Sequence, residues 1–155
     1  MELPQTGQCQ CGAIAYAIDA EPWTVYACHC HACQRQSGSA FGLSAILPAD
    51  AVRFTRGTPA EWRRRADSGR VSVALYCAGC GNRLMNRSED GATISLKPGT
   101  LGDTSWVRAV GHIWTESAQG WTAPFRRGPC YARQPDDFTA LRDAWAARDR
   151  QEQVT

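Results

Sequence analysis

The spacing of the cysteines constrains the fold of this chain more than any other feature. The 155 residues include eight cysteines, and seven of them lie in three short clusters. Cysteines this close in sequence are poor disulfide partners for one another but good chelating groups for a metal ion. The sequence therefore predicts metal sites rather than a disulfide framework. The clusters are Cys9 with Cys11, Cys28 with Cys30 and Cys33, and Cys77 with Cys80, while Cys130 stands alone.

The remaining composition is that of an ordinary globular protein. Hydrophobic residues make up 43% and charged residues 21%, and a chain of 155 residues suits a single domain. No apolar run approaches the roughly 18 residues needed to span a membrane. The first four residues do not open an apolar leader, so we expect a cytoplasmic protein whose thiols stay reduced.

The net charge gives little reason to expect a polyanionic partner. The formal charge is +2, and two Zn²⁺ ions bound by seven thiolates would bring it to about −1. Two short arginine runs, 63–65 and 126–127, are the features that favour nucleic acid. Such runs are more typical of solvated faces, so nucleic-acid binding is not expected.

Short apolar segments separated by Gly, Pro, Asp and Asn predict a mainly β fold with about eight to ten strands. One helix is expected at the end of the chain, capped by Asp136 and Asp137, with Phe138, Leu141 and Trp145 facing the sheet. Residues 151–155 are expected to fray. The predicted organisation is a zinc-binding β domain over 1–135 and a helix over 136–155 packed on it. The predicted strands are 14–18, 23–27, 41–47, 52–55, 61–64, 71–76, 83–86, 93–96 and 109–114.

The first and third clusters together predict a closed metal site. Cys77 and Cys80 have the spacing of a zinc knuckle, in which two intervening residues let both sulfurs face one ion. Cys9 and Cys11 lie two apart in an extended segment, so their sulfurs share one face. We therefore assign all four cysteines to one structural Zn²⁺, a tetrahedral site without an open position. The alternative is a group of buried thiols without metal.

The second cluster predicts a different kind of site. Cys28, Cys30 and Cys33 can occupy three corners of a tetrahedron, and the fourth corner has no obvious protein claimant. Three protein ligands plus an exchangeable one is the usual arrangement of catalytic zinc. His29 or His31 could instead close the site, support the ligands, or lie on the surface; for His31 we favour the surface. Cys130 is interpreted as a core or semi-buried thiol.

The order and spacing of these clusters resemble the glutathione-dependent formaldehyde-activating enzymes, a family that includes centromere-protein-V-like members. The resemblance covers about residues 5–125. It is carried by Gly7-Gln8-Cys9-Gln10-Cys11-Gly12, by the segment 28–41 that begins Cys28-His29-Cys30-His31-Ala32-Cys33, by the segment 76–84 around Cys77-Ala78-Gly79-Cys80-Gly81, and by His112-Ile113-Trp114.

The resemblance implies a β-tent of small antiparallel sheets around zinc. It also implies that Cys9, Cys11, Cys77 and Cys80 hold structural zinc and that Cys28, Cys30 and Cys33 hold catalytic zinc. The implied activity is a carbon–sulfur lyase reaction that joins glutathione and formaldehyde as S-hydroxymethylglutathione. For that chemistry Cys30 is a catalytic ligand and His29 a candidate for proton transfer. Arg35 is a candidate for binding a glutathione carboxylate.

Two other functions remain open from the sequence. One is a non-catalytic zinc module that binds protein or nucleic acid. The other keeps the thiol-adduct chemistry but changes the aldehyde or the thiol, because several aromatic residues could line a pocket for a bulkier substrate. These residues are Trp23, Phe41, Trp106, Trp114 and Trp121.

Overall fold

The computed structural model describes residues 1–66 and 69–148, and the expected fraying of 151–155 lies outside them. The chain forms two compact units. The first combines Met1–Pro22 with Ala45–Val107, and the second combines Trp23–Ser44 with the chain from Arg108 onward. Among the described residues, no helix has the length and apolar character needed to cross a bilayer.

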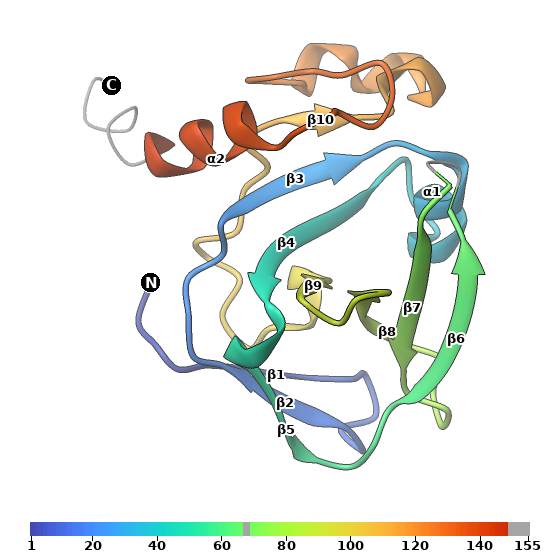
Figure 1. Ribbon diagram of the computed structural model, residues 1–155, viewed down its shortest axis with the longest axis vertical. Helices are drawn as coiled ribbons and strands as arrows, with labels where there is room; N and C mark the ends of the chain where they lie inside the picture. The colour runs from blue at the N-terminus through green and yellow to red at the C-terminus, as the bar shows by residue number, and fades with distance from the viewer. Residues whose placement is uncertain (67–68, 149–155) are drawn as a thin grey trace. The chain divides into compact units, whose positions relative to one another are not determined.

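The first unit consists of antiparallel strands (Figure 1). Three strands form a small sheet in the order β1-β2-β5: β1 (Gln5–Gln8), β2 (Ala15–Ile18) and β5 (Val52–Arg56). The others follow the order β4-β9-β8-β7-β6, and β4 enters this unit with its last residues. Their bounds are β4 (Gly42–Pro48), β9 (Thr93–Leu96), β8 (Arg83–Ser88), β7 (Val71–Tyr76) and β6 (Ala60–Arg65).

Apolar residues at alternate positions explain why these segments form strands with a buried face. Leu47 and Leu96 are completely buried, and the strands that carry them pair directly. In β2 the aromatic ring of Tyr16 and the side chain of Ile18 are also fully buried. Residues two apart lie on the same face of a strand, so Tyr16 and Ile18 are buried on one face of β2.

The second unit contains a parallel strand pair. Strand β3 (Thr24–Cys28) pairs with the two-residue strand β10 (His112–Ile113), with Ile113 opposite Cys28. The predicted strand over 109–114 is therefore too long. Strand β10 ends after Ile113 because Trp114 adopts a left-handed conformation that ends the extended chain.

Helix α1 (His31–Ser37) was not predicted, since its cysteines and polar residues show no helical apolar repeat. It begins directly after Cys30, whose sulfur accepts a hydrogen bond from the amide of Cys33, and it ends at Gly38 in the left-handed conformation. The segment after β3 thus leads directly into a helix N-terminus.

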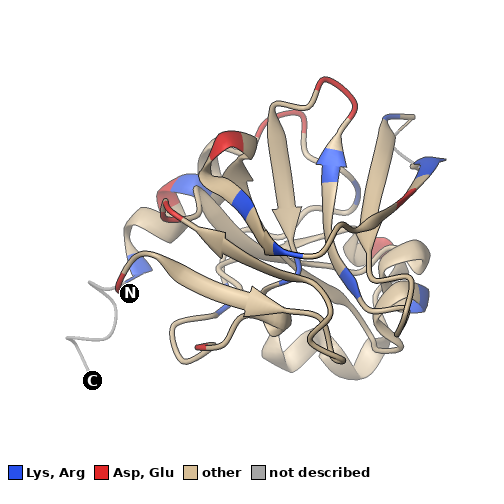
Figure 2. Ribbon diagram, turned by 90° about the horizontal axis from the view of Figure 1, so that it is seen from below, with Lys and Arg blue, Asp and Glu red and all other residues tan. Residues whose placement is uncertain are grey.

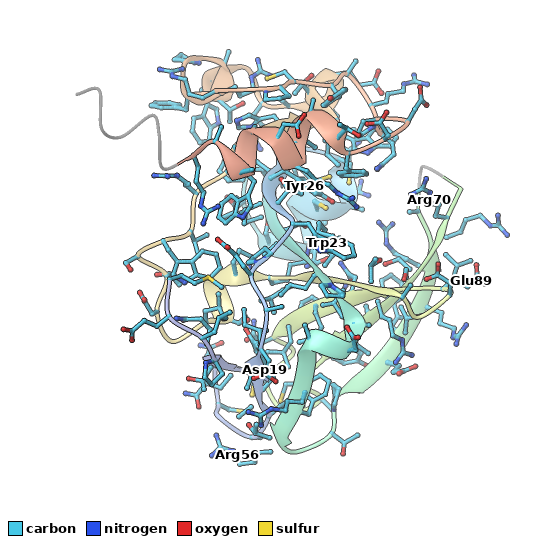
Figure 3. All side chains as sticks on the ribbon, turned by 60° about the vertical axis from the view of Figure 1, so that its left-hand side comes forward. Asp19, Trp23, Tyr26, Arg56, Arg70 and Glu89 are labelled. Atoms are coloured by element: carbon cyan, nitrogen blue, oxygen red, sulfur yellow. The ribbon has the colours of Figure 1, made fainter. Side chains whose placement is uncertain are left out.

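The C-terminal helix α2 (Thr139–Ala146) is present, but it begins later than predicted. The residue at its N-terminal boundary is Phe138, and Asp137 contributes a hydrogen bond from the amide of Thr139 to its carboxylate. Asp136 makes no cap. Leu141 and Trp145 are buried as expected, while Phe138 is half-buried and packs its ring 5.5 Å from that of Tyr26, which lies beneath the helix in Figure 3.

Candidate metal centres

The first unit brings the first and third cysteine clusters together. The sulfurs of Cys9, Cys11, Cys77 and Cys80 all lie within 4.8 Å of one another. Cys11 Sγ is 3.6 Å from Cys9 Sγ and 3.7 Å from Cys77 Sγ. Tetrahedral zinc with bonds of about 2.3 Å to sulfur separates its ligands by roughly 3.8 Å. The four sulfurs therefore have the spacing of a closed zinc site.

The backbone around these cysteines forms two tight turns that aim the sulfurs inward. Gly81 and Gly12 have φ values of +72° and +74°, a conformation that glycine adopts without steric cost. The amide of Gly81 donates to the carbonyl of Cys77, and the amide of Gly12 donates to the carbonyl of Cys9. Each glycine thus closes the turn that carries one chelating pair.

The pKa values of the thiols in this cluster differ from one another, because ionisation of one thiol opposes ionisation of its neighbours. Burial opposes ionisation of Cys9, but the amide of Ile14, 3.3 Å from the sulfur, and the neighbouring thiols lower the pKa of Cys9 to about 6. For Cys11 the backbone of Ala13 favours ionisation, but its three thiol neighbours outweigh it and raise the pKa to about 11. Four thiolates this close need a cation, and a divalent metal ion is one that this donor set could hold.

The second unit holds the other cluster, with the sulfurs of Cys28, Cys30 and Cys33 mutually within 4.8 Å. Cys28 is the last residue of β3, Cys30 precedes α1, and Cys33 lies in its first turn. Cys28 and Cys30 are buried, while Cys33 is half-buried. The end of a strand and the start of a helix therefore place three sulfurs around one point.

No further Cys, His, Asp or Glu donor joins these three sulfurs within residues 1–66 and 69–148. The donor set fits zinc because thiolates are preferred zinc ligands, and three protein ligands are typical of catalytic sites. The neighbouring thiols raise the pKa of Cys28 and lower the pKa of Cys30. The neighbouring thiols thus oppose ionisation of all three sulfurs at once, and a bound cation would relieve this repulsion.

His29 lies between two of these ligands but does not join them. Its side chain is completely buried, and its Nε2 is 3.0 Å from Nδ1 of His112. The ring of Phe41 lies 5.4 Å from that of His29. Burial lowers the pKa of His29, and Arg126 adds to this effect, while the backbone of Ala40 opposes it.

His112 was quoted in the sequence only as part of a weak motif, without a role. It is 7% exposed, and burial, His29 and Arg126 together lower its pKa to about 4. The residue that pairs with the predicted proton-transfer candidate is thus 83 positions away. Spacing within a motif carries no signal for such a contact.

The other candidates lie on the surface of the second unit. Arg35 and His31 are exposed on α1, as expected for His31. Cys130 is exposed rather than semi-buried: it follows the turn at Gly128, and its sulfur donates to the carbonyl of that glycine at 3.6 Å. The prediction of a core or semi-buried thiol is therefore wrong.

Basic and acidic residues are interspersed along the chain (Figure 2). The arginine run 63–65 lies on β6, where successive side chains point to opposite faces, and Arg64 is half-buried. Glu61 of the same strand pairs with Arg87 of β8 at 2.9 Å. The run therefore does not present three side chains on one face.

The family model described as glutathione-dependent formaldehyde-activating enzyme matches residues 4–117. This chain belongs to that family. The match includes all seven clustered cysteines and His112, and it ends before Arg126 and α2.

A solved structure shares the fold of this glutathione-dependent formaldehyde-activating enzyme family member. It is the crystal structure of a Rhodobacter sphaeroides protein, with a TM-score of 0.50 and 18% sequence identity. The alignment covers 66% of this chain and 90% of that one. At this identity the likeness concerns the fold alone.

Proposed function

We propose that this chain is a zinc-dependent carbon–sulfur lyase that forms and cleaves S-hydroxymethylglutathione. Family membership supports formaldehyde activation with glutathione. The observation that carries the proposal is the second cluster, in which three sulfurs converge and no fourth Cys, His, Asp or Glu of the described chain completes the set. The four-sulfur cluster, by contrast, supports a structural role.

The proposed reaction is an addition without any change of oxidation state. The glutathione thiol loses its proton, its sulfur bonds to the formaldehyde carbon, and the carbonyl π electrons move to oxygen, which takes up a proton. Zinc held by Cys28, Cys30 and Cys33 would act as a Lewis acid, which lowers the pKa of a thiol or polarises a carbonyl. Two zinc ions per chain are proposed, one for each cluster.

Residues around the second cluster would bind and orient the substrates. Arg35 is exposed on α1, two residues after Cys33, and remains the candidate for a glutathione carboxylate because guanidinium binds carboxylate through two hydrogen bonds. His29 is buried next to two of the ligands, where it can present a ring nitrogen. A cytoplasmic location, where glutathione is abundant and thiols stay reduced, is proposed with this function.

The zinc-loaded protein should accelerate formaldehyde consumption in the presence of glutathione beyond the spontaneous rate. Disappearance of formaldehyde would be followed with and without glutathione, for the natural chain and for Cys30→Ser. Cys130→Ser is the matched control, since that cysteine is exposed and outside both clusters. We expect loss of the acceleration only in Cys30→Ser. A rate equal to the uncatalysed reaction for the natural chain would overturn the proposed activity.

A further inference from the structure

The backbone between two cysteines of the second cluster is held by side chains as well as by strand pairing. His29 lies between Cys28 and Cys30 and is completely buried. Its amide donates to the carbonyl of Ile113 at 3.0 Å, which continues the pairing of β3 with β10. Strand β3 ends at Cys28, so the carbonyl of His29 takes its donors from elsewhere. A buried carbonyl without a hydrogen bond costs free energy, so these donors matter for stability.

Two side chains donate to the carbonyl of His29. Gln34, in α1, donates from Nε2 at 2.7 Å, and Ser117 donates from Oγ at 3.1 Å. The same Nε2 of Gln34 also donates to the carbonyl of Ser117 at 2.9 Å. The side chain of Gln34 therefore ties two segments of the second unit, 28–30 and 115–117, to helix α1.

The orientation of the Gln34 amide follows from its partners. Nε2 carries two hydrogens, and both of its partners are carbonyl oxygens, which only accept. Oε1 of Gln34 accepts from Nε2 of Gln119 at 3.4 Å. Gln119 is oriented in turn by the indole of Trp121, whose Nε1 donates to Gln119 Oε1 at 2.8 Å. An indole N–H can only donate, so this chain of hydrogen bonds runs in one direction, from Trp121 to the carbonyl of His29.

Gln34 is also joined to the other two cysteines of the cluster. Its backbone follows Cys33 directly, and its amide donates to the carbonyl of Cys30 at 3.0 Å. One residue thus adjoins Cys33 and bonds to His29 and Cys30. Loss of its side-chain amide would release the 28–30 segment from α1, and the separation of the three sulfurs depends on that attachment.

We infer that Gln34 is a positioning residue of the second cluster, whose side-chain amide holds the 28–30 segment and α1 at the separation at which three sulfurs can bind one ion. This inference rests on the proposed function for the presence of an ion at this cluster. It assigns Gln34 no contact with the ion or with a substrate. Residues that orient metal ligands from outside the ligand set typically contribute about 10-fold to 100-fold in metal affinity.

Cobalt(II) measures the effect without any assay of activity, because its absorption reports both uptake and coordination geometry. The protein would be titrated with Co²⁺ alone. Gln34→Met keeps the length of the side chain and suits a helix but donates no hydrogen bond. We expect the dissociation constant of the three-sulfur site to rise about 10-fold to 100-fold, with shifted absorption bands. The four-sulfur site shares no ligand with it and should be unchanged, as an internal reference.

Two further variants refine the comparison. Gln36→Met is the matched control, since Gln36 is a half-buried glutamine on the same helix, and it should bind cobalt as the natural chain does. Gln34→Asn retains an amide but withdraws it by one methylene, so a smaller loss is expected. Ser117→Ala leaves the shorter bond to His29 in place, and the double variant with Gln34→Met should lose more than the product of the two single losses.

Circular dichroism establishes which variants fold. The inference is overturned by cobalt binding equal to that of the natural chain in Gln34→Met, or in Gln34→Asn if only that variant folds, or by an equal loss in Gln36→Met. These outcomes leave the proposed function standing. If the variants behave as inferred but the natural chain adds no glutathione to formaldehyde, the proposed function fails and the role of Gln34 is retained.

Discussion

Among single residues, the thiols of the second cluster have pKa values that are shifted in opposite directions. Neighbouring sulfurs raise the pKa of Cys28 and lower that of Cys30, because one negative charge is accommodated and the next is opposed. The metal-free cluster therefore keeps protons at neutral pH that a bound metal must displace.

Zinc affinity at this cluster should consequently rise with pH. Because the folded, metal-free state retains the proton on Cys28, metal uptake releases protons, and an increase in pH favours the bound state. Competition with a chromophoric chelator between pH 6 and 8, together with proton release into weak buffer, measures the effect. An affinity that does not change over this range would contradict the protonation assigned to Cys28.

Removal of one sulfur from the second cluster should release one metal and leave the other. We expect Cys30→Ser to contain one zinc per chain, against two in the natural protein, with an unchanged β-sheet spectrum. The reason is that the two clusters lie in different compact units and share no ligand. Elemental analysis supplies the count, and Cys130→Ser should retain both ions. A natural chain with fewer than two zinc ions would contradict the two-site proposal.

Among the structural elements, α2 depends on a few buried contacts. Leu141 is fully buried, and the hydroxyl of Thr24 on β3 donates to its carbonyl at 2.8 Å. On the same helix, the guanidinium of Arg142 lies over the ring of Trp23, 4.8 Å from its centre. The helix is therefore held to β3 by its apolar face and by one buried hydrogen bond.

Leu141→Ala should destabilise the protein by about 2 to 5 kcal/mol, because it leaves a cavity between α2 and its neighbours. Ala140→Ser, on the exposed side of the same helix, should cost less than about 1 kcal/mol. Denaturant unfolding of the zinc-loaded proteins measures both values. Equal effects of the two substitutions would show that α2 does not contribute its apolar face to the core.

Elements with a strong local pattern were predictable from the sequence, and those defined by distant partners were not. Strands β7 and β9 have the predicted bounds because their apolar residues alternate. Strand β1 was missed because its buried residues are Gln5 and Gly7, which carry no apolar signal. Helix α1 was missed because the cysteines, and not an apolar repeat, determine its position.

The candidate sites follow the same distinction. Spacing predicted the two groups of cysteines, and the structure brings the sulfurs of each group within 4.8 Å of one another, while their role as metal ligands stays a prediction. The pairing of His29 with His112 required the register of a parallel strand pair, which two residues of β10 do not reveal in sequence. The boundary predicted at 135–136 stays a prediction, and the two compact units divide the chain elsewhere.

For the whole molecule, the two metal sites should contribute unequally to stability. The four-sulfur site joins residues 66 positions apart, since Cys11 and Cys77 are in contact. A metal that closes so long a loop restricts the unfolded chain strongly, and structural zinc contributes on the order of 10 kcal/mol to folding. The three-sulfur site closes only a few residues and constrains the unfolded chain little.

Cys77→Ser should therefore fail to fold stably, whereas Cys30→Ser should melt cooperatively near the temperature of the natural protein. Thermal unfolding followed by circular dichroism compares the two variants. The control is the natural protein treated with a strong chelator, which should lose its cooperative transition. Equal melting temperatures for the two variants would contradict the division into a structural and a catalytic ion.

The long span between the two halves of the four-sulfur site has a consequence for biosynthesis. The three cysteines of the second cluster are all present once residue 33 has left the ribosome. The four-sulfur site cannot close until Cys80 has emerged. If both proposed zinc ions bind, the ligands of the proposed catalytic ion are therefore synthesised before the last ligand of the proposed structural ion.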